Sequence, residues 1–188
     1  RDLDAFTHAI QPNTKVIFGE VLGNPGLEVL NIPKLSALAH EHDLPLMIDA
    51  TFVTPYLCRT IELGADIVVH SATKFLSGHG VVIGGVVVDG GTFDWRGKEK
   101  FPTLSQPYEG FHDLIFAEEF GPLAFITRAR REGIRDFGAC MAPMSAFQIL
   151  QGLETLPLRM QRHVANALAI AEFLETQEMV ESVSYPGL

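Results

Sequence analysis

The chain has 188 residues, 47% of them hydrophobic, which is enough apolar material for the core of one large domain or part of one. Its formal net charge of −9 argues against nucleic-acid and anionic-membrane partners, which bind clustered Lys and Arg, and the one dense cluster, at Arg128, Arg130 and Arg131, is most simply the solvated face of a helix. Two cysteines, and no signal-peptide pattern at the start, predict a cytoplasmic protein with reduced thiols rather than a disulfide framework.

The first elements alternate between helix and strand. Residues 2–10 are predicted to form a short helix with an acidic first turn, and residues 16–21 an apolar strand. The turn after that strand, residues 23–26, contains Asn24, which the following Pro25 restricts to an extended conformation. From the residues alone, Asn24 is explained at least as well by a turn as by a ligand contact.

A second strand follows another helix. Asn31 is expected to cap a helix that has a proline at its start and runs to about His42. Residues 44–48 then form a buried strand that ends at Asp49. Considered alone, Asp49 would be a helix cap or a salt-bridge partner. A short helix at 54–61 leads to the next strand, so two successive βα units predict parallel pairing.

The third strand, residues 66–70, leads into a polar turn that contains Ser71, Thr73 and Lys74. In open α/β sheets the carboxyl ends of the strands face the ligand crevice, where two hydroxyls suit a phosphate and an amine suits a carbonyl. Ser-x-Thr-Lys alone is equally typical of a solvated turn, and no P-loop pattern surrounds Lys74. Asp49, one βα unit upstream, completes the amine, hydroxyls and carboxylate that a pyridoxal phosphate site requires.

The second half is mainly helical. Residues 81–88 are predicted to form a strand antiparallel to the one before, because the turn between them is short, and this run is too short to cross a bilayer. Gly84 and Gly85 within it indicate either a close backbone approach, perhaps to another chain, or a bulge. The remaining expectations are a loop at 98–110, helices at 115–131, 145–156 and 158–176 with a break at Pro157, and a last strand at 180–185.

A metal-dependent hydrolase is the rival class of enzyme. Its candidate ligands are His40, His42, His70, His79, Asp43 and Asp49. The pair His40 and His42 falls near a helix end, where histidine suits the dipole, and side chains two apart on a helix do not face one site. We therefore expect no metal.

Much of the sequence resembles the Cys/Met-metabolism family of pyridoxal-phosphate enzymes, and within it the O-acetylhomoserine sulfhydrylase group. The resemblance covers nearly the whole chain in collinear order. It is carried by Gly23-Asn24-Pro25, Ile48-Asp49-Ala50-Thr51-Phe52, His70-Ser71-Ala72-Thr73-Lys74-Phe75, Gly78-His79-Gly80, Gly84-Gly85, Phe93-Asp94-Trp95 and Leu150-Gln151-Gly152-Leu153-Glu154-Thr155-Leu156.

The resemblance implies a three-layer αβα fold with a mostly parallel sheet, part of the fold-type I (aspartate aminotransferase-like) large domain, with pyridoxal phosphate as cofactor. Lys74 is implied as the catalytic residue, which holds the cofactor covalently and then moves protons. Asp49 would pair with the ring nitrogen, and Ser71 and Thr73 would hold the phosphate. Asn24 would lie against the ring and the substrate carboxylate.

The implied reaction is a γ-replacement on O-acetyl-L-homoserine with sulfide, giving L-homocysteine and acetate in methionine and cysteine biosynthesis. The related cystathionine γ-synthases and methionine γ-lyases are the alternatives. The sequence at residues 78–80 and 93–95 favours the sulfhydrylase group. An inactive interaction fragment is a further alternative. The implied partners are the amino-acid substrate, sulfide and copies of the same chain in a tetramer built from dimers.

The chain begins with Arg1, and the sequence there aligns with the middle of the family's large domain. We therefore expect the chain to be a fragment of a longer protein. Residues 1–157 would be the C-terminal part of the cofactor-binding large domain, and residues 158–188 the connecting helix and the start of the small C-terminal domain. The resemblance places the ring-stacking aromatic residue upstream of the chain and the carboxylate-binding arginine downstream. We expect residues 1–188 alone to bind the cofactor poorly.

Overall fold

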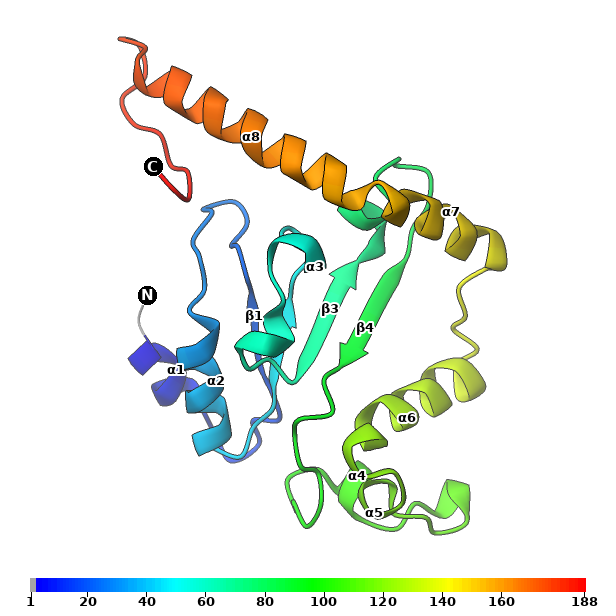
Figure 1. Cartoon of the computed structure of the whole chain (residues 1–188). Coiled ribbons are helices and arrows are strands. Elements are labelled where there is room, and N and C mark those ends of the chain that lie inside the picture. The colour runs from blue at the N-terminus through cyan, green and yellow to red at the C-terminus, as the bar shows by residue number, and fades with distance from the viewer. Residues whose placement is uncertain (1–2) are drawn as a thin grey trace.

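A computed structural model describes residues 3–188 and places four strands in one sheet (Figure 1). The strands are β1 (Ile17–Glu20), β2 (Leu46–Asp49), β3 (Ile67–Ser71) and β4 (Gly85–Asp89), in the spatial order β1-β2-β3-β4. The pairs β1–β2 and β2–β3 are parallel, and β3–β4 is antiparallel. The predicted parallel pairing and the antiparallel placement of the fourth strand are confirmed.

One face of the sheet is covered by helix α2 (Ile32–Glu41). Asn31 caps this helix as predicted, since its side chain accepts a hydrogen bond of 3.1 Å from the amide of Lys34. Leu35 and Ala39 of the helix are fully buried against Leu46 and Ile48 of β2 and their neighbours. Burial of these apolar side chains holds the helix on the sheet.

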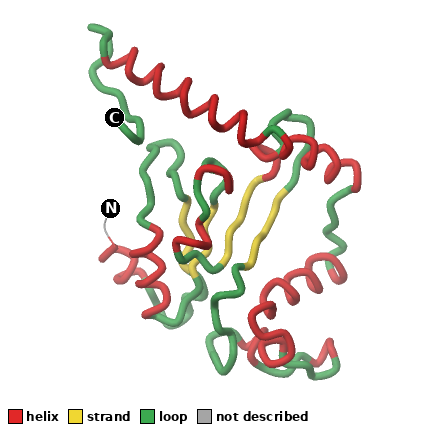
Figure 2. Tube along the Cα trace, in the orientation of Figure 1, coloured by secondary structure: helices red, strands yellow, loops and turns green. Residues whose placement is uncertain are grey.

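The opposite face of the sheet meets an aromatic layer. Ile67 of β3 is buried there with Phe93, Trp95, Phe101 and Phe116. The short helices of this layer are α4 (Pro102–Ser105), α5 (Phe116–Phe120) and α6 (Ala124–Arg130), which lie together at one end of the molecule (Figure 2). The expected three-layer α/β architecture is confirmed, with elements on both faces of the sheet, and Phe18 and Val87 on the second face stay about half exposed.

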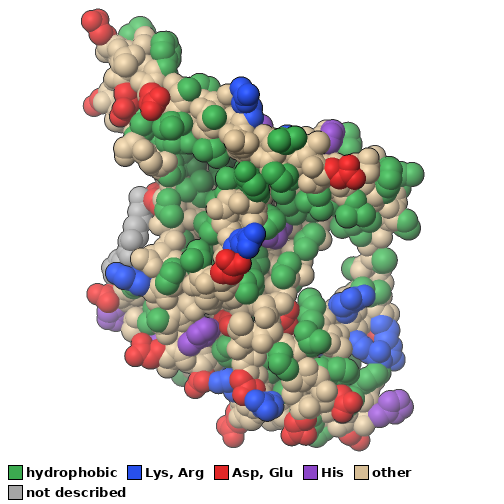
Figure 3. All heavy atoms as spheres, in the orientation of Figure 1, with side chains coloured by type: hydrophobic (Ala, Val, Ile, Leu, Met, Phe, Trp, Pro, Cys, Tyr) green, Lys and Arg blue, Asp and Glu red, His purple; other side chains and the backbone are tan. Residues whose placement is uncertain are grey.

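Two helices cross the carboxyl end of β3. Helix α7 (Pro143–Glu154) and helix α8 (Leu156–Glu175) enclose a third small core, made of Ala72, Leu76, Val82, Ile149, Leu156 and Met160. Figure 3 shows hydrophobic side chains gathered along these helices, with charged side chains at their outer surface and at the other end of the molecule. Gly84 lets α7 pack closely here. A Cβ at this position would lie 2.8 Å from the Ile149 side chain, which is too close for an unstrained contact. Gly84 thus meets a helix of the same chain, whereas Gly85 lies in β4 opposite Ser71.

The remaining elements are short. They are α1 (Leu3–Ala9), α3 (Thr54–Leu57), the π turns Ala72–Leu76 and Arg131–Asp136, and the 3-10 turns Thr60–Leu63, Glu109–Phe111 and Gly121–Leu123. Asp2, expected in the first turn of the first helix, lies outside the described residues. No helix within residues 3–188 is both long and apolar enough to cross a membrane.

Several predictions of secondary structure were wrong. The helix expected at 115–131 is divided, because Gly121 has φ 51° and Pro122 follows it. The helix expected at 54–61 is divided by the extended backbone of Cys58. The strand expected at 180–185 is a loop, since no strand lies beside it within the described part of the chain. The break expected at Pro157 occurs at Thr155 instead, and Pro157 lies inside the first turn of α8.

Candidate active site

The carboxyl ends of three parallel strands meet at one edge of the sheet. In the register of the strands, Glu20 of β1 pairs with Asp49 of β2, and Asp49 pairs with Val69 of β3. Ser71 is the last residue of β3. Glu20, Asp49 and Ser71 therefore end adjacent strands at the same edge, where ligands of open α/β sheets bind.

A small hollow of about 150 Å³ opens at this edge. We call it the strand-end hollow, and its lining residues are Glu20, Leu22, Asn24, Asp49, Thr51, Phe52 and Ser71. The structure thus brings Asn24, Asp49 and Ser71 together from three separate stretches of sequence. Lys74 and Thr73 do not line the hollow and lie in the turn that follows it.

Thr51 links two of these residues and was not identified from the sequence. Its amide donates a hydrogen bond of 2.8 Å to Oδ1 of Asp49, and its hydroxyl oxygen accepts one of 2.7 Å from the amide of Ser71. The contact to Asp49 forms a local turn in which a side-chain carboxylate receives the amide two residues on. Thr51 therefore fixes the Asp49 carboxylate relative to the end of β3.

Asn24 lies in an exposed turn at the rim of the hollow. Its amide donates a hydrogen bond of 3.3 Å to Oε2 of Glu20, and the peptide bond between Asn24 and Pro25 is cis. Glu20 brings a second carboxylate beside that of Asp49, and sequence reasoning missed it. Its position at the end of an apolar strand, four residues before Asn24, was the available signal.

Lys74 lies in the π turn Ala72–Leu76, which we call the lysine turn. Its backbone, at φ −90° and ψ −123°, departs from helical geometry and interrupts the turn. The side chain is exposed, and within residues 3–188 its amine forms no hydrogen bond or salt bridge. An amine without a competing partner is available for covalent chemistry.

Ser77, directly after the lysine turn, supports it from inside. It is 1% exposed, and its hydroxyl lies 3.1 Å from the carbonyl oxygen of Thr73 and 3.4 Å from that of Lys74. A buried hydroxyl that bonds to backbone carbonyls of the preceding turn is a local alternative to a helical hydrogen bond. Ser77 therefore helps to hold the backbone on both sides of the lysine.

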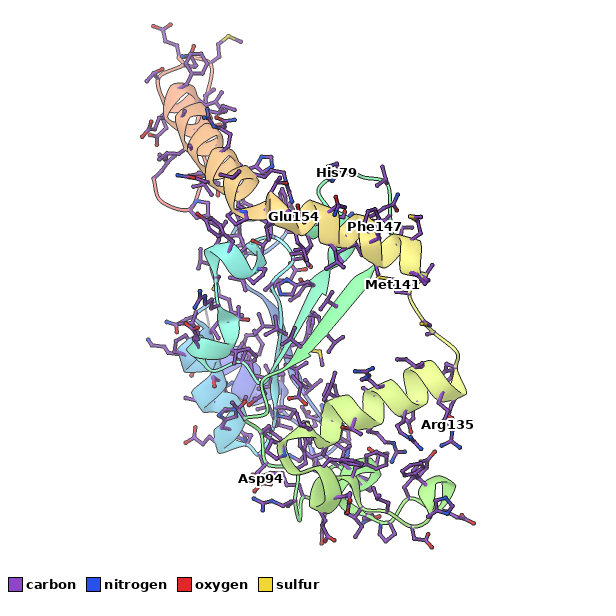
Figure 4. All side chains as sticks on the ribbon, turned by 45° about the vertical axis from the view of Figure 1, so that its right-hand side comes forward. His79, Asp94, Arg135, Met141, Phe147 and Glu154 are labelled. Atoms are coloured by element: carbon purple, nitrogen blue, oxygen red, sulfur yellow. The ribbon has the colours of Figure 1, made fainter. Side chains whose placement is uncertain are left out.

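Thr73 points toward the loop before β4. Its hydroxyl donates a hydrogen bond of 3.2 Å to the carbonyl oxygen of Gly84 and accepts one of 3.1 Å from the amide of the same glycine. A hydroxyl has one proton to donate, and in this orientation Gly84 receives it. Ser71, in contrast, has no hydrogen-bond partner for its hydroxyl among the described residues. Figure 4 shows the loop between Thr73 and β4, which carries His79, lying over α7.

His70 is buried next to the site, with 8% of its surface exposed. Burial lowers the pKa of its imidazole below the ordinary 6.5, against the opposing effects of a hydrogen bond with the Ala50 backbone and the negative charge of Asp49. Its Nδ1 atom has no hydrogen-bond partner within residues 3–188. These surroundings favour the neutral imidazole.

The donor set at this edge fits pyridoxal phosphate. Among the described residues it combines an amine without a partner, a carboxylate held by a backbone amide and a hydroxyl without a partner, which suit the aldehyde, the ring nitrogen and the phosphate respectively. Within residues 3–188 no group of three or more His, Cys, Asp and Glu side chains could hold a metal ion. The ligands that a metal-dependent hydrolase would require are thus not assembled in this part of the chain.

Comparison with known proteins gives a consistent result. The family model described as Cys/Met metabolism PLP-dependent enzyme matches residues 1–188. The chain is 48% identical to an O-acetyl-L-homoserine sulfhydrylase of Leptospira meyeri, covering 100% of this chain and 44% of that protein. It is 49% identical to a homocysteine/cysteine synthase of Kluyveromyces lactis, covering 97% of this chain and 42% of that protein.

A solved structure matches the fold over the whole length of this chain. It is described as an O-acetylhomoserine (thiol)-lyase of Campylobacter jejuni with N'-pyridoxyl-lysine-5'-monophosphate, and it superposes with a TM-score of 0.92 at 34% sequence identity. The match covers 100% of this chain and 46% of that one. The chain therefore spans less than half the length of these relatives.

Proposed function

The chain belongs to the family of Cys/Met metabolism PLP-dependent enzymes, and from this we propose that the full-length protein is an O-acetylhomoserine sulfhydrylase. In the proposed reaction sulfide replaces the acetyloxy group at Cγ of O-acetyl-L-homoserine. The carbon–oxygen bond at Cγ breaks first and releases acetate, and the carbon–sulfur bond then forms at the same carbon to give L-homocysteine. The observation that carries the proposal is the amine of Lys74 in the turn directly after β3, beside the strand-end hollow that contains Asp49.

Each residue of the site has a proposed role. Pyridoxal phosphate supplies an aldehyde that bonds to an amine and a ring that accepts electrons from a carbon–hydrogen bond next to the amino group. Lys74 would hold the cofactor covalently and, once displaced by the substrate amine, take the proton from Cα and then one from Cβ. Asp49 would keep the ring nitrogen protonated. Because Thr51 already orients that carboxylate, little reorganisation is needed on binding.

The phosphate would bind at the end of β3. The Ser71 hydroxyl has no partner among the described residues and lines the hollow, so it can donate to a phosphate oxygen. Thr73 would contribute its proton only after leaving the carbonyl of Gly84. Asn24, exposed at the rim, would contact the substrate carboxylate through its amide group.

A related γ-synthase or γ-lyase is the second candidate, because those reactions require the same lysine and carboxylate. The names of the relatives from Leptospira meyeri and Kluyveromyces lactis favour sulfhydrylation. Phe93 and Trp95 belong to the sequence segment that favours the sulfhydrylase group. Both are buried in the aromatic layer, where the centres of their rings are 4.7 Å apart. These two residues would therefore distinguish the sulfhydrylase group by how the aromatic layer packs and not by contact with the substrate. Products distinguish the candidates: homocysteine from a sulfhydrylase, cystathionine from a γ-synthase given cysteine, and a 2-oxo acid with ammonia from a lyase.

We also propose how the chain is organised in the whole protein. Residues 1–157 would be the C-terminal part of the cofactor-binding domain, and residues 158–188, which include most of α8, would connect it to a smaller domain. The full-length protein would be a cytoplasmic homotetramer. Light scattering of the purified protein tests the tetramer, and a mass of one or two subunits would contradict it.

The first test is visible absorbance of the full-length protein before and after borohydride. We expect wild type to show a band that borohydride abolishes, with the pyridoxyl label on Lys74. Lys74→Ala should lack both the band and the label. Lys34→Ala, which alters another exposed lysine, is the matched control and should behave as wild type. A label on another lysine, or no band with cofactor added, would contradict the proposal.

A further inference from the structure

The guanidinium of Arg159, in helix α8, bonds to three separate points of the chain. Its Nη1 donates a hydrogen bond of 2.9 Å to the carbonyl oxygen of Phe75, and its Nη2 one of 2.7 Å to that of Gly152. Its Nε donates one of 3.1 Å to the hydroxyl of Thr155. Within residues 3–188 Arg159 forms no salt bridge, so all these partners are neutral.

One of these points is in the lysine turn itself. Phe75 is the residue directly after Lys74, and 84 residues separate it from Arg159. Because Lys74 interrupts the regular geometry of this turn, the turn depends on contacts from outside for its shape. A charged donor on the carbonyl next to the lysine is such a contact.

Two glycines let the guanidinium and helix α7 lie directly on this backbone. A Cβ on Gly78, which has φ 70°, would lie 2.5 Å from Cζ of Arg159. A Cβ on Gly152 would lie 2.0 Å from the carbonyl oxygen of Ser77. The end of α7, the start of α8 and the residues around Lys74 therefore meet at one side chain.

We propose that Arg159 is a positioning residue that sets the direction in which Lys74 presents its amine to the cofactor. The inference rests on the proposed function of Lys74. The planar fork of arginine reaches the carbonyls of Phe75 and Gly152 at once, whereas a lysine supplies one ammonium that cannot hold both in this geometry. Arg159→Lys keeps the charge and removes the bridge.

The test compares full-length wild type with Arg159→Lys and Arg159→Ala. The readouts are the dissociation constant of pyridoxal phosphate from absorbance, the fraction of Lys74 trapped by borohydride at saturating cofactor, and kcat and KM. For both variants we expect about tenfold weaker cofactor binding, a smaller trapped fraction, and kcat lowered about tenfold with KM nearly unchanged, because misplacing a reacting group by about 1 Å can cost about a hundredfold and a smaller misplacement costs less. Arg162→Ala, an exposed arginine on the same helix, is the control and should match wild type.

Thermal unfolding of each variant separates positioning from general stability. If Arg159→Lys lowers only the melting temperature, while cofactor binding and trapping stay as in wild type, Arg159 is a structural residue and the inference is wrong. If the pyridoxyl label in wild type is not on Lys74, the proposed function is wrong, and this outcome is distinct from a failure of the inference about Arg159 alone. If the Arg159 variants do not fold, Thr155→Val and Thr155→Ser replace them in the test. The valine removes the hydrogen-bond acceptor of Arg159 Nε and should lower the fraction of Lys74 trapped by borohydride, whereas the serine keeps the acceptor and should restore that fraction. Wild-type trapping in Thr155→Val would then refute the inference.

Discussion

Replacing Gly152 by alanine should push helix α7 away from the lysine turn. The added Cβ would lie 2.0 Å from the carbonyl oxygen of Ser77 and 2.7 Å from that of Leu76. Contacts of a Cβ below 3.0 Å are essentially not found, so the two backbones must separate by about 1 Å. Both atoms belong to backbone that the end of β3 and the small core hold in place, so rotation of a side chain cannot relieve the clash.

The expected cost follows from two opposing effects. Overpacking of a buried site costs about 1–3 kcal/mol, and a clash between backbones belongs at the upper end. Alanine is favoured over glycine inside a helix by about 1 kcal/mol, which offsets part of this. We therefore expect Gly152→Ala to lower the free energy of unfolding by about 2 kcal/mol.

The assay is urea unfolding of the full-length protein, with the trapped fraction of Lys74 measured in the native state. Gly133→Ala is the matched control, because a Cβ there would meet nothing within 4 Å and the residue also lies in a helical turn. Gly152→Ala should be less stable than this control and should trap less cofactor. A Gly152→Ala protein as stable as the control, with full trapping, would refute the close packing of α7 on the lysine turn.

Three further changes test the site. Asp49→Asn removes the proposed partner of the ring nitrogen and should lower kcat by about a hundredfold or more, as loss of a preorganised electrostatic partner does; steady-state kinetics that match wild type would contradict the assignment. Thr51→Val leaves the Ser71 amide without an acceptor and should cost about 1 kcal/mol in urea unfolding, whereas Thr51→Ser should not. Burial lowers the pKa of His70 from 6.5, so the folded state binds a proton at His70 less readily than the unfolded state does. The contribution of His70 to the free energy of unfolding is therefore fully present above pH 6.5 and falls as the pH drops toward the pKa in the folded state. His70→Gln should show a flatter fall in unfolding free energy over that range, with a difference in slope of at most about 1.4 kcal/mol per pH unit, and equal slopes would contradict a neutral His70.

The sheet was predictable because its strands are short apolar runs that end in polar turns. The runs at 44–48 and 66–70 became β2 and β3 with shifts of one or two residues. The segment at 180–185 has Val180, Val183 and Tyr185 among polar residues and forms a loop. Its Tyr185 and the following Pro186 instead line an apolar groove against α8. A strand needs a neighbouring edge, and periodicity within a segment carries no information about such a neighbour.

The candidate site was predictable in part for a similar reason. Asp49 and Ser71 are polar residues at the ends of buried strands, and parallel pairing brings such ends together. Thr73 stands in the same motif, yet the turn directs its hydroxyl to Gly84, because the strand ends at Ser71 and the alternation of side chains ends with it. Residue type predicted the chemistry here, and the local backbone decided the direction.

The supports of Lys74 could not be found from the motif because they come from distant sequence. Ser77 and Gly78 are close to the lysine, but Gly152 and Arg159 lie on helices at the other end of the chain. Each acts through backbone carbonyls, which every residue possesses, so no residue type at 72–76 indicates them. A turn whose shape depends on such contacts can present its amine only after α7 and α8 have packed. The stability of that packing and the reactivity of Lys74 should therefore change together in variants at Gly152 and Arg159, and independently of Asp49.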